Sequence, residues 1–384
     1  MKKIWKILLT LLVIILLVVL LIYLIDLDRM SKGEKVLFST WGRDYIASSE
    51  NKENNLEKEN IVATMDIVTS LEDETTENSA WCGTFNLIWN DLKNDLAKRD
   101  IIFNPQPDSV NNLNKGTFNT AYLSENSYYK VYGNPSLELK ETIEKAIKEK
   151  FNETSDILDD FSWQDGNKSD YFLYAMLKKE FEFPMEFTEL ENGKFGDFEN
   201  IKYFGINEQT SEDVRNQVQV LYYYSEEEFA IKLLTKGNDE VIISKGSTEN
   251  NFLESYKAIE NREKEYLSTS AGEAEFLEYD TLKIPNINID LKQEFTEVEQ
   301  KPFLFANGDT YVIDKALQTI KFDLDKKGGK IKSEAGMSMK FSMIESAEPR
   351  NFIVDDTFDI YLKEEGKDLP YFAARISDIS KLQK

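Results

Sequence analysis

The feature that most constrains the fold of this chain is a pair of alternating stretches near its carboxyl end. In residues 316–325 one face consists of Ala316, Gln318, Ile320, Phe322 and Leu324, and the other face carries Lys321, Asp323 and Asp325. Lys-Lys-Gly-Gly follows at 326–329, and a second alternation over 333–343 has one face made of Ser333, Ala335, Met337, Met339, Phe341 and Met343. A period of two residues indicates a strand with one buried face. The chain therefore contains two predicted strands joined by a flexible, charged turn.

Strand patterns also outnumber helix patterns elsewhere in the chain. Further strands are predicted at 171–178, 217–224, 229–235, 240–244, 287–291 and 352–362. Apolar residues at helical spacing predict helices over 85–96, 135–151 and 251–266, and the second is expected to start with Asn134 as its cap and Pro135 as its first residue. Neither a βαβ rhythm nor a glycine-rich phosphate loop occurs. We therefore predict an α+β fold with large mixed or antiparallel sheets.

The composition excludes several classes of function. The chain has no histidine, which excludes Ser-His-Asp and Cys-His catalysis and the usual histidine-containing zinc sites. Carboxylates such as Asp355 and Asp356 would point to opposite faces of a strand, so we predict no enzymatic activity, no cofactor and no metal site. A net charge of −24 also disfavours nucleic acid as a partner. The single cysteine, Cys82, lies among aromatic residues and is interpreted as a buried apolar side chain.

The amino-terminal residues predict a membrane anchor. Residues 7–25 carry no charge, and as a helix they would span about 28 Å, close to the thickness of the hydrocarbon core of a bilayer. No small-residue cleavage pattern follows them, so residues 1–28 are interpreted as an uncleaved signal-anchor that binds the lipid bilayer through 7–25. The short basic amino terminus favours a cytoplasmic start, with the remainder of the chain extracytoplasmic. Polar residues then indicate a tether over 29–78, and a globular domain is predicted over 79–384.

Several segments of the globular part resemble the serpin family. Residues 313–328, IDKALQTIKFDLDKKG, and the SEAGMSM at 333–339 are similar to a serpin strand that leads through a turn and a small-residue hinge into the reactive loop. Residues 352–379 look like the family's closing pair of strands. Upstream, residues 139–161, 170–187 and 282–295 are similar to the helix that crosses the main sheet, to the central strand that follows it and to a leucine-proline strand. The matching pieces come in family order over about two thirds of the chain.

The chain also departs from the family pattern. Only residues 79–135 are available for the early serpin helices, so this helical region is expected to be abbreviated. Gln318 stands where the family's sheet-opening region has a histidine, and Thr357 stands where it has a proline. The resemblance is therefore to a divergent, shortened, bacterial-type serpin, with an α+β fold and one added transmembrane helix.

The resemblance further implies a hinge and a reactive loop. The hinge candidates are Gly328, Ser333, Glu334, Ala335, Gly336 and Met337. Counting from Ser333 to Phe358 places the bond cut by a protease at Ser346-Ala347, and the reactive-loop candidates are Met343, Ile344, Glu345, Ser346, Ala347 and Arg350. In inhibitory serpins the cut loop inserts into the main sheet as a new strand. The parity of 333–343 fits such insertion, but Met337 and Met339 are larger than the alanines usual in inhibitory hinges.

Two functions follow from these features. We expect a membrane-anchored, extracytoplasmic serpin-like protein that no longer inhibits and serves as a surface binding or structural module, with another cell-surface protein as its partner. The alternative is a working protease inhibitor with its reactive loop near Ser346-Ala347. In the first case 333–343 is a permanent strand of the sheet, and in the second it is free until a protease cuts the loop.

Overall fold

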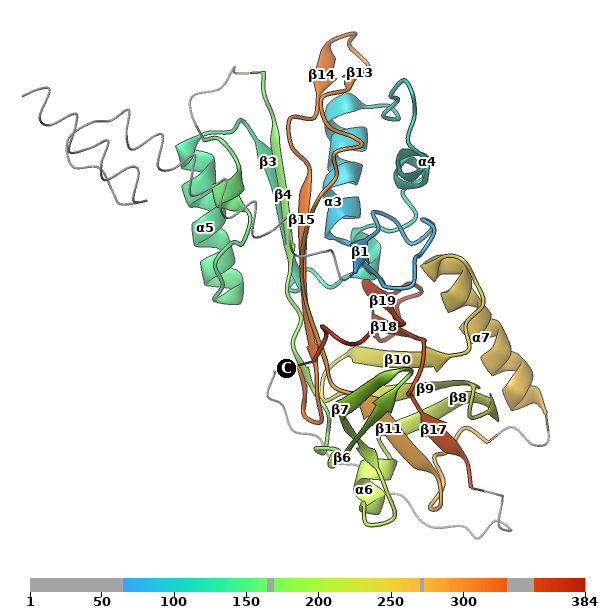
Figure 1. Ribbon diagram of the computed structural model, residues 1–384. Helices are drawn as coiled ribbons and strands as arrows, with labels where there is room; N and C mark the ends of the chain where they lie inside the picture. The colour runs from blue at the N-terminus through green and yellow to red at the C-terminus, as the bar shows by residue number, and fades with distance from the viewer. Residues whose placement is uncertain (1–64, 164–168, 270–272, 330–348, 384) are drawn as a thin grey trace, which may run out of the picture. The chain divides into compact units, whose positions relative to one another are not determined.

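The predicted strands assemble around a seven-stranded sheet (Figure 1). The structure is a computed structural model, and it describes residues 65–163, 169–269, 273–329 and 349–383. Neighbouring strands pair in the order β1 (Asp66–Ile67), β2 (Ser79–Cys82), β19 (Phe372–Ile376), β18 (Phe358–Glu364), β10 (Asp239–Lys245), β9 (Glu228–Leu234) and β8 (Val218–Ser225). All pairs are antiparallel except β1 with β2. The predicted mixed, mainly antiparallel sheet is thus confirmed.

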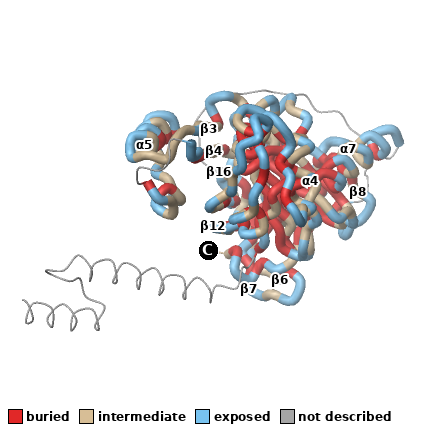
Figure 2. The backbone as a smooth tube through the Cα atoms, turned by 90° about the horizontal axis from the view of Figure 1, so that it is seen from above, coloured by how far each residue is buried: buried red, intermediate tan, exposed pale blue. Residues whose placement is uncertain are grey.

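A second sheet of four strands contributes to the same core. Its order is β17 (Asn351–Ile353), β11 (Thr281–Pro285), β7 (Phe198–Ile206) and β6 (Thr188–Phe195). Aromatic rings join the two sheets, since Phe352 of β17 lies 5.3 Å from Phe229 of β9 and 4.9 Å from Tyr223 of β8 between ring centroids. Such contacts bury large apolar area and make this part of the molecule its main core (Figure 2).

Four two-stranded ribbons complete the strands of the described residues. They are β3 (Tyr128–Gly133) with β4 (Phe172–Leu177), β12 (Ile287–Glu294) with β15 (Leu317–Leu324), β5 (Phe181–Glu182) with β16 (Gly328–Gly329), and β13 (Pro302–Leu304) with β14 (Thr310–Val312). In β15 the even-numbered residues are buried and Lys321 and Asp323 are exposed, as the alternation predicts. These ribbons carry the candidate site.

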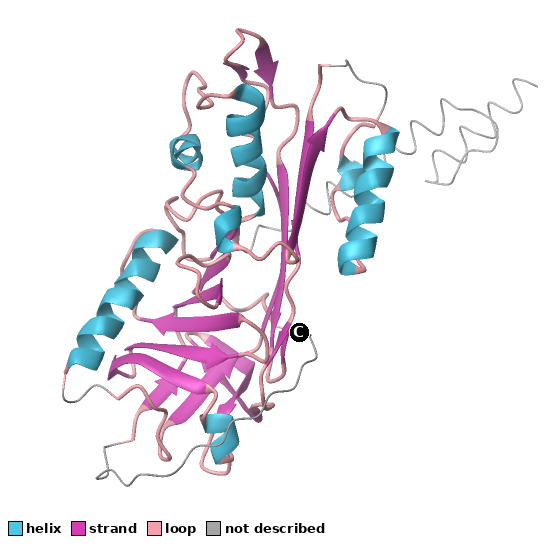
Figure 3. Ribbon diagram, turned by 180° about the vertical axis from the view of Figure 1, so that it is seen from behind, coloured by secondary structure: helices cyan, strands magenta, loops and turns pink. Residues whose placement is uncertain are grey.

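Helices cover both faces of the β3–β4 ribbon (Figure 3). On one face, α5 (Leu137–Phe151) packs Ile143, Ile147 and Phe151 against Tyr174 in a small core of its own. On the other face lie α3 (Thr84–Asp91) and its π-helical continuation η1 (Leu92–Ala97). The remaining helical elements are α4 (Asp108–Lys115), η2 (Thr120–Tyr122), η3 (Leu158–Asp160), α6 (Glu212–Arg215) and α7 (Phe252–Ser268). The three predicted helices correspond to α3 with η1, to α5 and to α7.

The structure corrects two local predictions. The cap of α5 is Ser136, whose Oγ accepts a hydrogen bond from the backbone N–H of Leu139, and not Asn134 followed by Pro135. The predicted strand over 352–362 is two strands, β17 and β18, which belong to different sheets because the chain turns between Ile353 and Phe358.

The boundaries of the folded unit bear on the predicted tether and anchor. The unit begins at Met65, and it includes residues of the segment 65–78 that the sequence assigns to the tether, since Met65, Ile67 and Leu71 are buried in the main core. Among the described residues no helix is long and apolar enough to cross a membrane. The predicted anchor at 7–25 lies outside them.

Candidate functional site

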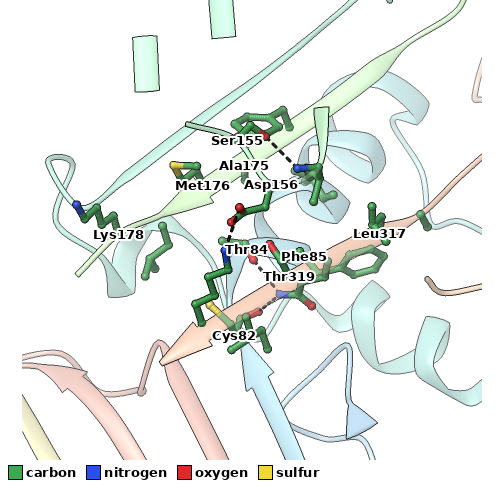
Figure 4. Close-up of a pocket in the computed structure, with 18 of the residues that line it drawn as sticks. Cys82, Thr84, Phe85, Ser155, Asp156, Ala175, Met176, Lys178, Leu317 and Thr319 are labelled. Atoms are coloured by element: carbon green, nitrogen blue, oxygen red, sulfur yellow. Dashed lines mark hydrogen bonds and ion pairs between the residues drawn. The ribbon is translucent and has the colours of Figure 1, made fainter. Parts of the chain in front are cut away.

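A large cavity lies between β4 and β15 (Figure 4). Its volume is about 1320 Å³, and its walls include Leu173, Ala175 and Leu177 of β4 and the facing length of β15. Sites for small ligands usually have about 300–1,000 Å³, so this cavity is large enough for a longer, extended occupant. Helix α3 closes its inner side with Phe85, Ile88 and Trp89.

Each of the two strands that flank the cavity has one edge without a partner strand among the described residues. Within the described ranges, β4 pairs only with β3 and β15 pairs only with β12. An unpaired edge exposes backbone N–H and C=O groups that can accept another strand. Because both edges line one cavity, a single extended segment placed there would pair on its two sides at once.

The short strand β16 begins such a segment at the lower end of the cavity. A turn joins it to β15, with the N–H of Gly328 donating to Asp325 O at 3.1 Å. Gly328 pairs with Glu182 of β5, and the Phe183 N–H donates to Lys327 O at 3.0 Å. Gly328 has φ +95°, and a Cβ there would lie 2.7 Å from Phe181 O. Only glycine fits both demands, so this hinge candidate is fixed by the geometry of the turn.

The floor of the cavity holds an unsatisfied polar atom. Gln318 of β15 is 4% exposed, and its Nε2 donates to Cys82 O at 3.0 Å and to Thr84 Oγ1 at 2.8 Å. Its Oε1 is buried without a hydrogen-bond partner in the described structure. A buried acceptor without a donor is destabilising. Cys82 is half-buried beside it, and burial raises the pKa of its thiol.

A segment that we call the strap, residues 153–163, covers the outer side of the cavity. Asp156 and Lys321 of β15 form an ion pair at 2.9 Å, and Asp160 pairs with Lys292 of β12. Towards its other end the strap packs Trp163 on Phe172 of β4, with ring centroids 4.7 Å apart. The strap is therefore attached on both sides of the cavity.

A buried charge cluster fixes the lower end of β4 to the seven-stranded sheet. Lys179 lies 2.9 Å from Asp239 of β10 and 2.7 Å from Glu364 of β18, and the hydroxyl of Tyr371 donates to Asp239 at 3.1 Å. Burial raises the pKa of Asp239, although Lys179 and Tyr371 partly offset this effect. Burial would also raise the pKa of Glu364, but hydrogen bonds from Lys179 and Ser124 outweigh it, so that pKa lies below its usual value.

The structure places two of the predicted site residues, Gly328 and Arg350. Arg350 is buried, and its guanidinium contacts Asp280 at 2.6 Å, Glu275 O at 2.6 Å and Glu273 O at 2.9 Å. It therefore anchors the chain where it returns to the fold before β17. The other predicted hinge and loop residues, 333–337 and 343–347, lie outside the described residues.

Sequence reasoning did not find the strap contacts or the cavity. Asp156 and Asp160 are far from Lys321 and Lys292 in sequence, and no local periodicity connects them. The one available signal was the resemblance of 139–161 to a helix that crosses a sheet, because it places the residues after α5 above the strands.

Comparisons with known proteins give distant structural likenesses alone. No protein-family model and no curated protein matches the chain. Serpin48, described as a highly specific serpin of the insect Tenebrio molitor, is 14% identical with a TM-score of 0.39, over 67% of this chain and 78% of that chain. Native protease nexin-1 with heparin is 12% identical with a TM-score of 0.43, over 67% and 80%. Thyroxine-binding globulin in complex with thyroxine is 12% identical with a TM-score of 0.37, and the matched part covers 62% of this chain and 64% of that protein.

Proposed function

We propose that the protein is a membrane-anchored, extracytoplasmic protease inhibitor that takes up its own chain after Gly329 as a strand between β4 and β15. The observation that carries the proposal is the pair of open strand edges that face one cavity, with β16 at its end. The surface module would fill the same two edges permanently with 333–343, so the two functions differ in when this strand is added.

The register of β16 supports the proposal. Continuing its pairing with β5 past Gly329 would bring Ala335 opposite Ala175 of β4. Continuing the turn between Asp325 and Gly328 would bring the same Ala335 opposite Gln318 of β15. Both extrapolations start from Gly328, and they direct 331, 333, 335 and 337 towards the inner side, where the Gln318 side chain is buried.

The inward residues suit the walls that they would meet. Small Ser333 and Ala335 would pass the level of Gln318, where the floor is polar and closed by Cys82. Met337 would lie higher, on the side lined by Phe85 and Trp89. An unbranched methionine adapts to such aromatic surroundings, so its bulk is less of an obstacle here than in an alanine-lined sheet.

A test uses the full chain in detergent with a panel of serine and cysteine proteases. An inhibitor forms a covalent complex stable in denaturing gels, and chain cut within 343–350 gains thermal stability because a new strand is added. Ala335→Arg places a charge on the inward face and should turn the inhibitor into a cleaved substrate without complex. Glu334→Arg is the matched control, since its side chain would face outward and leave complex formation intact.

The results separate the two functions. Cleavage within 343–350 with neither a complex nor a rise in melting temperature would refute inhibition by strand uptake and leave the surface module. Equal behaviour of the two arginine variants would refute the proposed register.

A further inference from the structure

One end of the folded unit carries most of its exposed large hydrophobic side chains. Ten such residues are exposed among the described ones. Six of them gather around the β13–β14 hairpin and the adjoining ends of β3, β4 and α5: Ile102 (57%), Tyr132 (39%), Leu137 (64%), Tyr171 (45%), Leu304 (48%) and Val312 (50%). We call this group the apolar end. Large exposed apolar patches usually mark a surface that contacts a protein or a membrane.

Direct contacts bring the segments of the apolar end together. The Tyr171 ring lies 6.3 Å from Phe305 and 6.0 Å from Tyr311, between centroids, which joins the start of β4 to the hairpin. Phe103, next to Ile102, lies 5.5 Å from Phe303 of β13. The β3–β4 pairing places Tyr132 opposite Leu173, two residues from Tyr171, and Leu137 begins α5 shortly after β3 (Figure 1).

The exposed side chains are held by a rigid aromatic support. Phe305 stacks on Tyr311 with centroids 4.0 Å apart, and both Phe303 and Phe305 are buried beneath the hairpin. In β13 and β14 the residues that alternate with these rings, Leu304 and Val312, therefore point outward. Their exposure follows from strand geometry with a packed inner face, and it is not a frayed terminus.

The chain outside the described residues indicates what covers this end. Residues 1–64 precede the folded unit, and they include the uncharged run 7–25. If 26–64 behave as a flexible chain, their reach is about 35 Å, so a bilayer that holds 7–25 stays within about one molecular diameter of the unit. A tethered surface needs little intrinsic affinity, because the tether raises its effective concentration.

We propose that the apolar end docks on the interface of the bilayer in which residues 7–25 are anchored. The proposal rests on that predicted anchor and not on protease inhibition. Aromatic and aliphatic side chains on a rigid hairpin suit the headgroup region of a zwitterionic membrane. The net charge of −24 disfavours anionic lipid as the partner.

Docking would orient the candidate site. Tyr171, Phe305 and Tyr311 line the upper part of the cavity and also support the apolar end. The entrance at β16 lies at the opposite ends of β4 and β15, where Gly328 pairs with Glu182. The reacting segment would then face away from the membrane, towards soluble proteases.

The test compares two single-cysteine probes in the full chain, reconstituted into dioleoylphosphatidylcholine vesicles. In a Cys82→Ala background, Leu304→Cys and Met185→Cys carry the same environment-sensitive NBD label. Met185 is a matched control because it is 46% exposed, against 48% for Leu304, and it follows β5 at the other end. We expect blue-shifted emission, and loss of most of it to brominated lipid, at position 304 alone.

Three quenching results would overturn the proposal. These are the absence of quenching at 304, equal quenching at 304 and 185, and quenching that appears only when phosphatidylglycerol is added. A chain that does not enter the vesicles overturns it as well. The doubly substituted Leu304→Ser, Val312→Ser chain, labelled at Ile102→Cys, should lose quenching at an unchanged melting temperature. Complex formation with proteases in detergent is independent of all these results, so the failure of either proposal is recognised separately.

Discussion

Two of the ion pairs that hold the strap connect it to the β12–β15 ribbon and differ in burial, and this difference predicts how easily the cavity opens on that side. The Asp160 and Lys292 side chains are 26% and 30% exposed, whereas those of Asp156 and Lys321 are 45% and 53% exposed. Measured values for surface pairs range from about 0.2 to 1 kcal/mol, and solvent screening reduces those of the more exposed ones. We therefore assign about 1 kcal/mol to the first pair and about 0.3 kcal/mol to the second.

Substitution of either aspartate should raise the fraction of molecules with an open strap. About 1 kcal/mol corresponds to roughly a fivefold change in an opening equilibrium, so Asp160→Asn should open the strap about five times more often. Asp156→Asn should change it less than about twofold. Neither variant should lower the global free energy of unfolding by more than about 1 kcal/mol.

Cys82 provides the assay, because it is the only cysteine and lines the same cavity as the strap. Burial raises the pKa of its thiol, so a thiol reagent reacts slowly until the cavity opens. When opening is rapid compared with reaction, the labelling rate is proportional to the open fraction. Glu149→Gln is the control, since the pair of Glu149 with Lys145 on α5 is 69% and 76% exposed and lies away from the strap.

Labelling of Asp160→Asn at the wild-type rate would refute the reasoning, as would an equal acceleration in Glu149→Gln. Raising the salt concentration should accelerate labelling of the wild type more than that of Asp160→Asn, because only the wild type still has the pair to screen.

Three further predictions concern stability. Gly328→Ala should lower the free energy of unfolding more than Gly308→Ala in urea titrations. Both glycines have φ above +90°, but of the two only Gly328 has backbone atoms within 4 Å of an added Cβ. We expect about 1 kcal/mol from the backbone strain alone, and equal losses in the two variants would contradict the close approach at Gly328. Burial would raise the pKa of Glu364, but its hydrogen bonds lower that pKa below the unfolded value of about 4.3. The ionised Glu364 side chain therefore stabilises the fold above that pH, and this contribution disappears as the pH falls through the lower folded pKa. Unfolding free energies at about pH 5 and pH 3 should therefore differ less for Glu364→Gln than for the wild type, and the same slope in both would contradict this linkage. Arg350→Met should cost about 3–5 kcal/mol in the same titrations because it leaves Asp280 buried and unpaired, whereas a loss below 1 kcal/mol would show that the pair does not anchor β17.

Local patterns predicted most individual elements, because each depends on residues that are close in sequence. The alternation over 316–325 gave β15 with its buried face, and apolar residues every four positions gave α5. The error at the start of α5 is also local, since three polar or proline residues compete for the cap and only the Ser136 hydroxyl reaches the Leu139 N–H. The division of 352–362 depended on which sheet each half joins, and local sequence does not contain that information.

The candidate site was harder to predict because it consists of two strand edges that have no partner strand among the described residues. The open edges of β4 and β15 become visible only when every other pairing is known. The unsatisfied Oε1 of Gln318 likewise depends on Cys82 and Thr84, more than two hundred residues earlier in the chain. Alternation indicated that Gln318 faces inward, but not that its carboxamide would be only half satisfied.

The charge cluster around Lys179 makes the two ends of the cavity differ in how firmly β4 is held. At the lower end, its ion pairs to Asp239 and Glu364 and the pairing of β16 with β5 tie β4 to the rest of the fold. At the upper end, the contacts found between β4 and the hairpin are ring contacts of Tyr171 with Phe305 and Tyr311. Once the strap is released, the two ribbons are thus expected to separate more easily at the upper end than at the end held by Lys179. A strand that enters at the held end advances towards the side that widens, so each residue added makes room for the next, and uptake would proceed in one direction only.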